Sequence, residues 1–150
     1  MQSTLVSGSL QHTRVLLADD HAVVRRGLRT ILEATDEYEV CGEAADGNTT
    51  LDLALRLHPD IVITDISMAP TNGLEVTRCL RRLAPDLKVL ILTMHDSAEM
   101  LRAAASAGAS GYLLKSDAEE LLILALETVH AGRRFVSPSF NSVLVKQIFA

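Results

Sequence analysis

The chain has 150 residues, the size of one ordinary domain, which argues against a conventional two-domain enzyme. Hydrophobic residues make up 48% and charged residues 22%, so wholesale disorder is excluded. Fourteen Lys and Arg against nineteen Asp and Glu give a net charge of -5, which argues against nucleic-acid binding by these residues.

Residues 1–13 lack the charged and apolar regions of a signal peptide, and we expect them to form a flexible N-terminal leader. No apolar run approaches the length of a membrane span. Cys41 and Cys79 form neither a disulfide framework nor a metal-binding pair. These features together favour a reducing, cytoplasmic location.

From residue 14 onward, short apolar runs alternate with amphipathic stretches. The runs are apolar at consecutive positions, as in the strands of a parallel sheet that is buried on both faces. We predict strands at Val15–Ala18, Val40–Cys41, Ile61–Ile63, Val89–Leu92 and Tyr112–Leu114. Helical spacing of apolar residues predicts helices at about His21–Ala34, Asn48–His58, Leu74–Ala84, Ser97–Ala107 and Asp117–Ala131.

This alternation predicts a doubly wound α/β domain over residues 14–132, with five parallel strands and helices on both faces of the sheet. Residues 133–150 form a tail or linker, in which Ser137-Pro138 is expected to cap a short helix from about Ser139 to Phe149. Ligands of such open sheets bind just outside the carboxyl ends of the strands. Functional residues are therefore expected directly after each strand.

Polar side chains stand at four of the five predicted strand ends. Asp19 and Asp20 follow the first strand, Asp65 the third, Thr93 the fourth and Lys115 the fifth. Three carboxylates at one edge repel each other unless a cation lies among them, and all-oxygen ligands select a hard ion such as Mg2+. Lys115 and the Thr93 hydroxyl suit a phosphoryl group, and Asp65 is the natural nucleophile for an aspartyl-phosphate.

These residues lie in segments that resemble the receiver domains of two-component response regulators, especially those of the NarL/FixJ (LuxR-type) family. The resemblance covers about residues 14–135. It rests on VLLADDH (15–21), IVITDISM (61–68), NGLE (72–75), VLILTMH (89–95) and GASGYLLK (108–115). The resemblance implies a flavodoxin-like (CheY-like) fold, (βα)5 with strand order 2-1-3-4-5.

The resemblance also implies that a sensor histidine kinase passes a phosphoryl group to Asp65. Mg2+ would be held directly by Asp20, Asp65 and the backbone carbonyl of Ser67, with Asp19 acting through water. Mg2+ is the cofactor that the resemblance implies.

Thr93 and Lys115 would contact the phosphoryl group, and Thr93 and Tyr112 would form the switch. The surface that changes would be built by the helix 97–107, the strand 112–114 and the helix 117–131. Partners or a second receiver would read this surface.

One loop departs from the family pattern. Receivers commonly have proline four residues after the phosphoacceptor, whereas this chain has Ala69 there and Pro70 next. We therefore expect a different path for the loop 67–72, which bears on the carbonyl of Ser67. His21 and His95 flank the pocket, and we expect both to be solvated loop residues.

The helix at about Asp117–Ala131 has apolar residues on more than one face. One face holds Ala118, Leu121, Leu122, Ala125 and Val129, whereas Ile123, Leu124 and Leu126 fall outside it. We interpret the second face as a surface for self-association, which would give a homodimer, or for domain docking. The alternative is a set of singly exposed leucines.

We predict a Mg2+-dependent phosphoacceptor that assists its own phosphorylation and dephosphorylation and is not a turnover enzyme. NarL/FixJ receivers usually precede a helix-turn-helix domain, and these residues contain none. Two possibilities stay open: a transcriptional regulator that binds DNA through a domain beyond Ala150, and a stand-alone receiver that acts through protein contacts. The enzyme alternative is a haloacid-dehalogenase-type phosphatase, but that family has an Asp-x-Asp motif at its first strand, and Asp65 precedes Ile66-Ser67 on the third.

Overall fold

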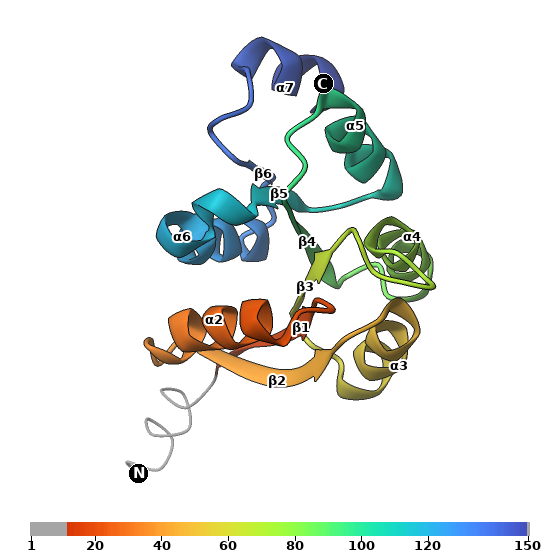
Figure 1. Cartoon of the computed structure of the whole chain (residues 1–150), viewed down its shortest axis with the longest axis vertical. Helices are drawn as coiled ribbons and strands as arrows, with labels where there is room; N and C mark the ends of the chain where they lie inside the picture. Colours follow the sequence, from red (N-terminus) through yellow and green to blue (C-terminus); the bar gives the residue numbers. More distant parts are fainter. Residues whose placement is uncertain (1–11, 150) are drawn as a thin grey trace.

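The computed structural model describes residues 12–149 and shows a single six-stranded parallel sheet between layers of helices (Figure 1). The predicted leader lies outside the described residues except for His12 and Thr13, and Thr13 already begins the first strand. The strands are β1 (Thr13–Ala18), β2 (Tyr38–Ala44), β3 (Ile61–Asp65), β4 (Lys88–Thr93), β5 (Gly111–Leu114) and β6 (Phe135–Val136).

The strand order is β2-β1-β3-β4-β5-β6, so the predicted order 2-1-3-4-5 is confirmed and one strand is added. In β6, Phe135 and Val136 pair in parallel with Gly111 and Tyr112 of β5. β6 was not predicted, because two residues are too few to show an alternating pattern. As a consequence, β5 is not the edge of the sheet.

Helices cover both faces of the sheet, because the strands are apolar on both sides. One face packs against α2 (Ala22–Glu33) and α6 (Ala118–His130). The other packs against α3 (Gly47–Leu57), α4 (Gly73–Leu83) and α5 (Ala98–Ala107). Two hydrophobic cores result, one on each side of the central strands.

The helices α3, α4 and α5 each begin at a residue whose side chain accepts a backbone hydrogen bond. Asp46 caps α3, Asn72 caps α4 and Ser97 caps α5. Such caps satisfy amide groups in the first helical turn that have no partner within the helix. They also fix the position at which each loop at the carboxyl edge of the sheet ends.

The interpretation of α6 as having a broad second apolar face is wrong in part. Leu126 is fully buried and Ile123 packs partly against the core, while Leu124 is exposed. The buried arc is wider than predicted because α6 contacts α2 as well as strands β4 to β6. Self-association through α6 stays a prediction, with Leu124 as the exposed leucine on this helix.

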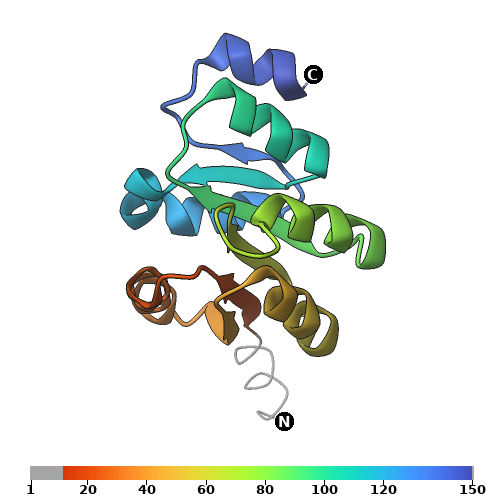
Figure 2. The ribbon, with the colours of Figure 1, turned by 45° about the vertical axis from the view of Figure 1, so that its right-hand side comes forward.

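The last helix, α7, spans Ser142–Phe149 and lies against α5 (Figure 2). The prediction that Ser137-Pro138 caps this helix is wrong. Ser137 is buried, and its hydroxyl accepts a hydrogen bond from the backbone N–H of Leu114 at 2.8 Å. Asn141 caps α7 instead, because its side chain accepts hydrogen bonds from the N–H groups of Val143 and Leu144.

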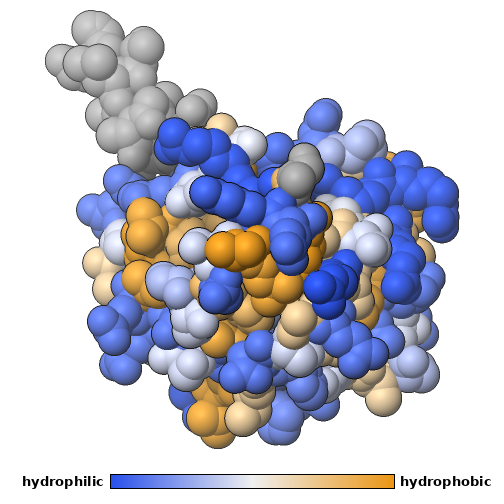
Figure 3. Space-filling view, turned by 90° about the horizontal axis from the view of Figure 1, so that it is seen from above, coloured by the Kyte–Doolittle hydropathy of each residue, from blue (hydrophilic) through white to orange (hydrophobic). Residues whose placement is uncertain are grey.

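Seen from the α7 end, the surface is polar with separate apolar patches (Figure 3). No helix within residues 12–149 is both long enough and apolar enough to cross a bilayer. Cys41 and Cys79 are free and half-buried, in agreement with the absence of a disulfide framework from the sequence pattern.

Candidate functional site

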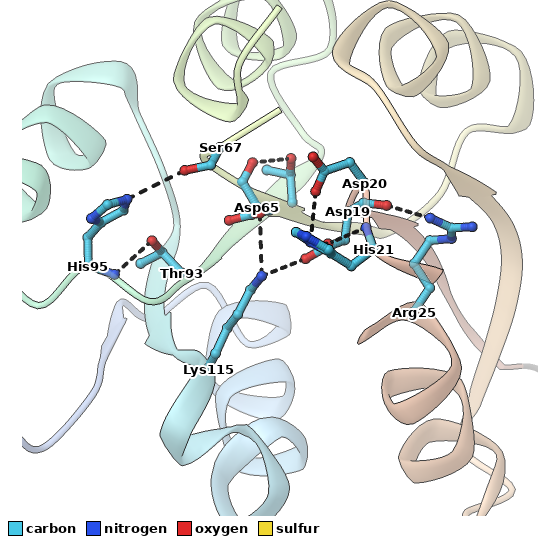
Figure 4. Close-up of polar contacts among 10 residues, drawn as sticks. Asp19, Asp20, His21, Arg25, Asp65, Ser67, Thr93, His95 and Lys115 are labelled. Carbon is cyan, nitrogen blue, oxygen red and sulfur yellow. Dashed lines mark hydrogen bonds and ion pairs between the residues drawn. The ribbon is translucent and has the colours of Figure 1, made fainter. Parts of the chain in front are cut away.

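The carboxyl ends of β1, β3, β4 and β5 meet at one edge of the sheet and bring the five predicted side chains together (Figure 4). Asp19 and Asp20 follow β1, Asp65 ends β3 and Thr93 ends β4. Lys115 follows β5 and begins the short 3-10 helix η1 (Lys115–Asp117). Because parallel strands share a direction, residues far apart in the sequence converge here.

Lys115 joins the carboxylates of two strands. Its Nζ lies 2.9 Å from Asp19 Oδ2 and 3.4 Å from Asp65 Oδ2. Asp19 and Asp65 are almost fully buried, at 1% and 4% exposure, whereas Asp20 is exposed. One ammonium group faces three carboxylates, so the pocket has a surplus of negative charge.

Burial raises the pKa of Asp65 above its ordinary value of 3.8; the Lys115 ammonium opposes this effect, and the Asp19 carboxylate reinforces it. Burial alone would lower the pKa of Lys115, but its hydrogen bond to Asp19 and the charge of Asp65 outweigh that effect and raise it. Lys115 therefore stays protonated and positively charged, whereas the negative charge of Asp65 lowers the free energy of unfolding.

The donor set fits a hard divalent cation. The ligand atoms are carboxylate oxygens, and their negative charge exceeds the positive charge of Lys115. The Asp20 carboxylate is exposed, so the pocket is open to solvent on that side. These are the features that Mg2+ sites in proteins share. Ser67 lies in the loop after β3, and the role of its carbonyl as a ligand stays a prediction.

His21, expected to be a solvated loop residue, contacts two carboxylates of the pocket. Its Nδ1 lies 2.9 Å from Asp20 Oδ1 and 3.3 Å from Asp19 Oδ1, although the side chain is 68% exposed. Arg25, one turn into α2, donates a hydrogen bond to the carbonyl of Asp19 at 2.6 Å. Position next to Asp20 was the signal for His21, but no local pattern identifies Arg25.

His95 was also expected to be only a solvated loop residue, and its side chain is exposed. Its backbone, however, links two predicted site residues. The His95 N–H donates to Thr93 Oγ1 at 3.1 Å, and Tyr112 Oη donates to the His95 carbonyl at 3.0 Å. The His95 ring also lies 3.4 Å from the Ser67 hydroxyl.

The loop between β3 and α4 brings Gly73 directly against the backbone of Asp65. Ala69–Pro70 is a cis peptide bond, and the Gly73 N–H donates to the Ile66 carbonyl at 2.9 Å. A Cβ atom on Gly73 would lie 2.0 Å from the carbonyl oxygen of Asp65. Gly73 is thus required by close packing against the backbone of Asp65.

We expect Mg2+ to stabilise the protein, because it relieves repulsion among the carboxylates only in the folded state. At a concentration about ten times its Kd, the gain in unfolding free energy is about 1.4 kcal/mol. Thermal unfolding with MgCl2 and with NaCl at matched ionic strength measures it. Asp20→Asn should reduce the shift, and Asp52→Asn, in the exposed Asp52–Arg56 pair of α3, should not. An equal shift with both salts would contradict a specific site.

Comparison with known proteins identifies relatives over most of the chain. The family model described as response regulator receiver domain matches residues 15–127. The oxygen regulatory protein NreC of Staphylococcus epidermidis is 42% identical over 135 residues, which are 89% of this chain and 62% of that protein. The transcriptional regulatory protein DegU of Brevibacillus brevis is 36% identical over 134 residues, which are 89% of this chain and 57% of that protein.

Solved structures agree with this assignment. A two-component response regulator of the LuxR family from Aurantimonas sp. SI85-9A1 has a TM-score of 0.84 and 37% sequence identity, covering 93% of this chain and 100% of that one. The curated relatives are longer, and this chain spans about three fifths of their length. The comparisons therefore concern the receiver part of those proteins.

Proposed function

This chain belongs to the response regulator receiver domain family, and on that premise we propose that Asp65 accepts a phosphoryl group from the phosphohistidine of a sensor kinase. The observation that supports this role is the convergence of a buried carboxylate, a paired lysine and a buried threonine hydroxyl at one sheet edge. Asp65 lies at the centre of this group.

The proposed transfer is a single displacement at phosphorus. An oxygen of the Asp65 carboxylate attacks the phosphorus atom, and the new P–O bond forms as the P–N bond to the kinase histidine breaks. The imidazole nitrogen leaves with the electron pair of that bond and later takes up a proton from solvent. The product is an aspartyl-phosphate, a mixed anhydride that water can hydrolyse.

Two side chains of this pocket stabilise the charge on the transferred group. The Lys115 ammonium, held between Asp19 and Asp65, is placed to neutralise a phosphoryl oxygen, and the Thr93 hydroxyl can donate a hydrogen bond to another. When bound, Mg2+ would supply further neutralisation of the charge on the phosphoryl group. Asp20 and Asp65 would hold the ion directly, with the Ser67 carbonyl, and Asp19 would hold it through water.

The chain assists its own phosphorylation and dephosphorylation but is not proposed to turn over a substrate. Thr93 and Tyr112 would form the switch, and the surface of α5, β5 and α6 would respond. We propose a cytoplasmic protein whose receiver spans residues 14–132. The relatives named as regulators support a role in transcription, with DNA contacts made by residues outside this chain. A homodimer through α6 and the neighbouring surface is a further proposal.

Phosphoramidate, a small donor with a P–N bond, provides a direct test without a kinase. With Mg2+ we expect one added phosphoryl group by intact-protein mass spectrometry, and none with excess EDTA. Borohydride reduction followed by peptide mapping should place the group on Asp65. Labelling at another residue, or labelling that persists with EDTA, would contradict the proposal.

A further inference from the structure

Residues 135–149, here called the C-terminal strap, lie outside the stretch that the family model matches. The strap consists of β6, a turn and α7. It starts beside β5 at the edge of the sheet and ends against α5 (Figure 2). It therefore crosses the part of the molecule that holds Tyr112.

The strap contacts both the backbone and the aromatic ring of Tyr112. The Ser137 N–H donates to the Tyr112 carbonyl at 2.9 Å, and the Ser137 hydroxyl accepts from the Leu114 N–H at 2.8 Å. The Phe140 ring packs edge-on against the Tyr112 ring, with 5.5 Å between centroids and 73° between planes. Ser137 and Phe140 are both buried, so these contacts are shielded from water.

Tyr112 in turn is connected to the phosphoryl site. Its hydroxyl donates to the His95 carbonyl, and the His95 N–H donates to Thr93 Oγ1. Burial, helped by the charge of Asp96, raises the pKa of Tyr112 to about 12, so its hydroxyl remains a donor at neutral pH. Because the Thr93 oxygen accepts from His95, its own proton is free to be donated to a phosphoryl oxygen.

The far end of the strap is fixed as well. The Arg134 guanidinium lies 4.3 Å from the centroid of the Phe149 ring and donates to the Phe149 carbonyl at 3.2 Å. The apolar residues of α7 pack against the core that α5 also lines: Leu144, Val145, Ile148 and Phe149. Phe140 is thus held against Tyr112 by β6, which precedes it in the sequence, and by α7, which follows it.

We propose that Phe140 is a positioning residue for the phosphoryl site, acting through Tyr112 and His95 on the Thr93 hydroxyl. Docking of the strap and binding of a phosphoryl group then favour the same conformation. The inference rests on the proposed role of Asp65. Because coupling between two sites is reciprocal, loosening the strap must weaken phosphoryl binding, and phosphoryl binding must tighten the strap.

Beryllofluoride, a phosphoryl mimic, tests the coupling by titration calorimetry with Mg2+ present. We expect Phe140→Ala to weaken its binding about fivefold or more, the lower range of typical coupling. Tyr112→Phe should weaken binding similarly, and Phe140→Ala should add little in that background because both changes break one chain of contacts. Phe140→Leu should be intermediate. Val143→Ala, at a 61% exposed position of α7, is the matched control and should bind as the wild type does.

Hydrogen exchange supplies the reciprocal measurement on unmutated protein. The backbone amides of α7 should exchange more slowly when beryllofluoride is bound. Unchanged exchange in α7, wild-type affinity in a folded Phe140→Ala variant, or additive losses in the double variant would each overturn the role of Phe140. Failure of the wild type to bind beryllofluoride, or equal binding by Asp65→Asn, would instead overturn the proposed function.

Discussion

An Asp65→Asn variant is expected to fold, to be more stable than the wild type without Mg2+, and to lose phosphorylation. The amide is not a nucleophile, so incorporation from phosphoramidate should fall by about a thousandfold or more, to background. Stability should rise because the raised pKa of Asp65 shows that its buried charge disfavours the folded state at neutral pH. Mass spectrometry and urea unfolding of the same samples measure both effects.

The pH dependence of stability tests the expected stabilisation by Asp65→Asn. A carboxyl group whose pKa is raised by folding contributes stability below its ordinary value of 3.8, and this contribution is lost as pH rises through the raised value. The metal-free wild type should lose stability across that range, and Asp65→Asn should not show this loss. Asp52→Asn, an exposed carboxylate of α3, is the charge-matched control. Phosphorylation retained in Asp65→Asn would exclude Asp65 as the acceptor.

A Gly73→Ala variant should lose both stability and phosphorylation, although the residue has no side chain and contacts no ligand. The added Cβ would lie 2.0 Å from the Asp65 carbonyl oxygen and 2.8 Å from its carbonyl carbon, so the backbone must shift. We expect a loss of about 3 kcal/mol in unfolding free energy, the upper range for overpacking. Phosphorylation should slow because the same shift displaces Asp65.

Gly27→Ala provides the matched control, since it makes the same chemical change inside α2. A Cβ on Gly27 meets no atom within 4 Å apart from its chain neighbours and the backbone of its own helix. Alanine favours a helix over glycine, so this variant should gain about 0.5 to 1 kcal/mol in unfolding free energy. Urea unfolding of the two variants should therefore give changes of opposite sign. A stable, normally phosphorylated Gly73→Ala variant would show that the loop can adapt without moving Asp65.

Local sequence patterns were sufficient to predict the five main strands and the edge of the sheet at which the site forms. The strands are apolar at consecutive positions, and that pattern depends only on burial of both faces. Asp65, Thr93 and Lys115 stand at strand ends, and the parallel arrangement brings strand ends together wherever the side chains point. The resemblance to receivers rests on these same residues.

Contacts between different elements of the fold could not be predicted from local sequence patterns. Leu126 is buried in the core that α2 and α6 both line, and Gly73 is required because the backbone of Asp65 lies directly against it. Ser137 has the residue type of a helix cap, but its hydroxyl bonds to Leu114 of β5 instead. In each case the deciding neighbour lies in a different element of the fold, so periodicity and capping preferences did not predict the contact.

The sequence by itself determined the α/β class, the strand order through the family resemblance, and the acidic pocket with its lysine and threonine. Only the tertiary structure showed that residues of the predicted tail pack against the domain, with β6 pairing to β5 and Phe140 packing on Tyr112. The physical reason is the distance along the chain over which each kind of interaction acts. Strand and helix patterns arise from burial repeated along a few residues, whereas the contacts that link Phe140, Tyr112, His95 and Thr93 are single contacts between segments that meet only after folding.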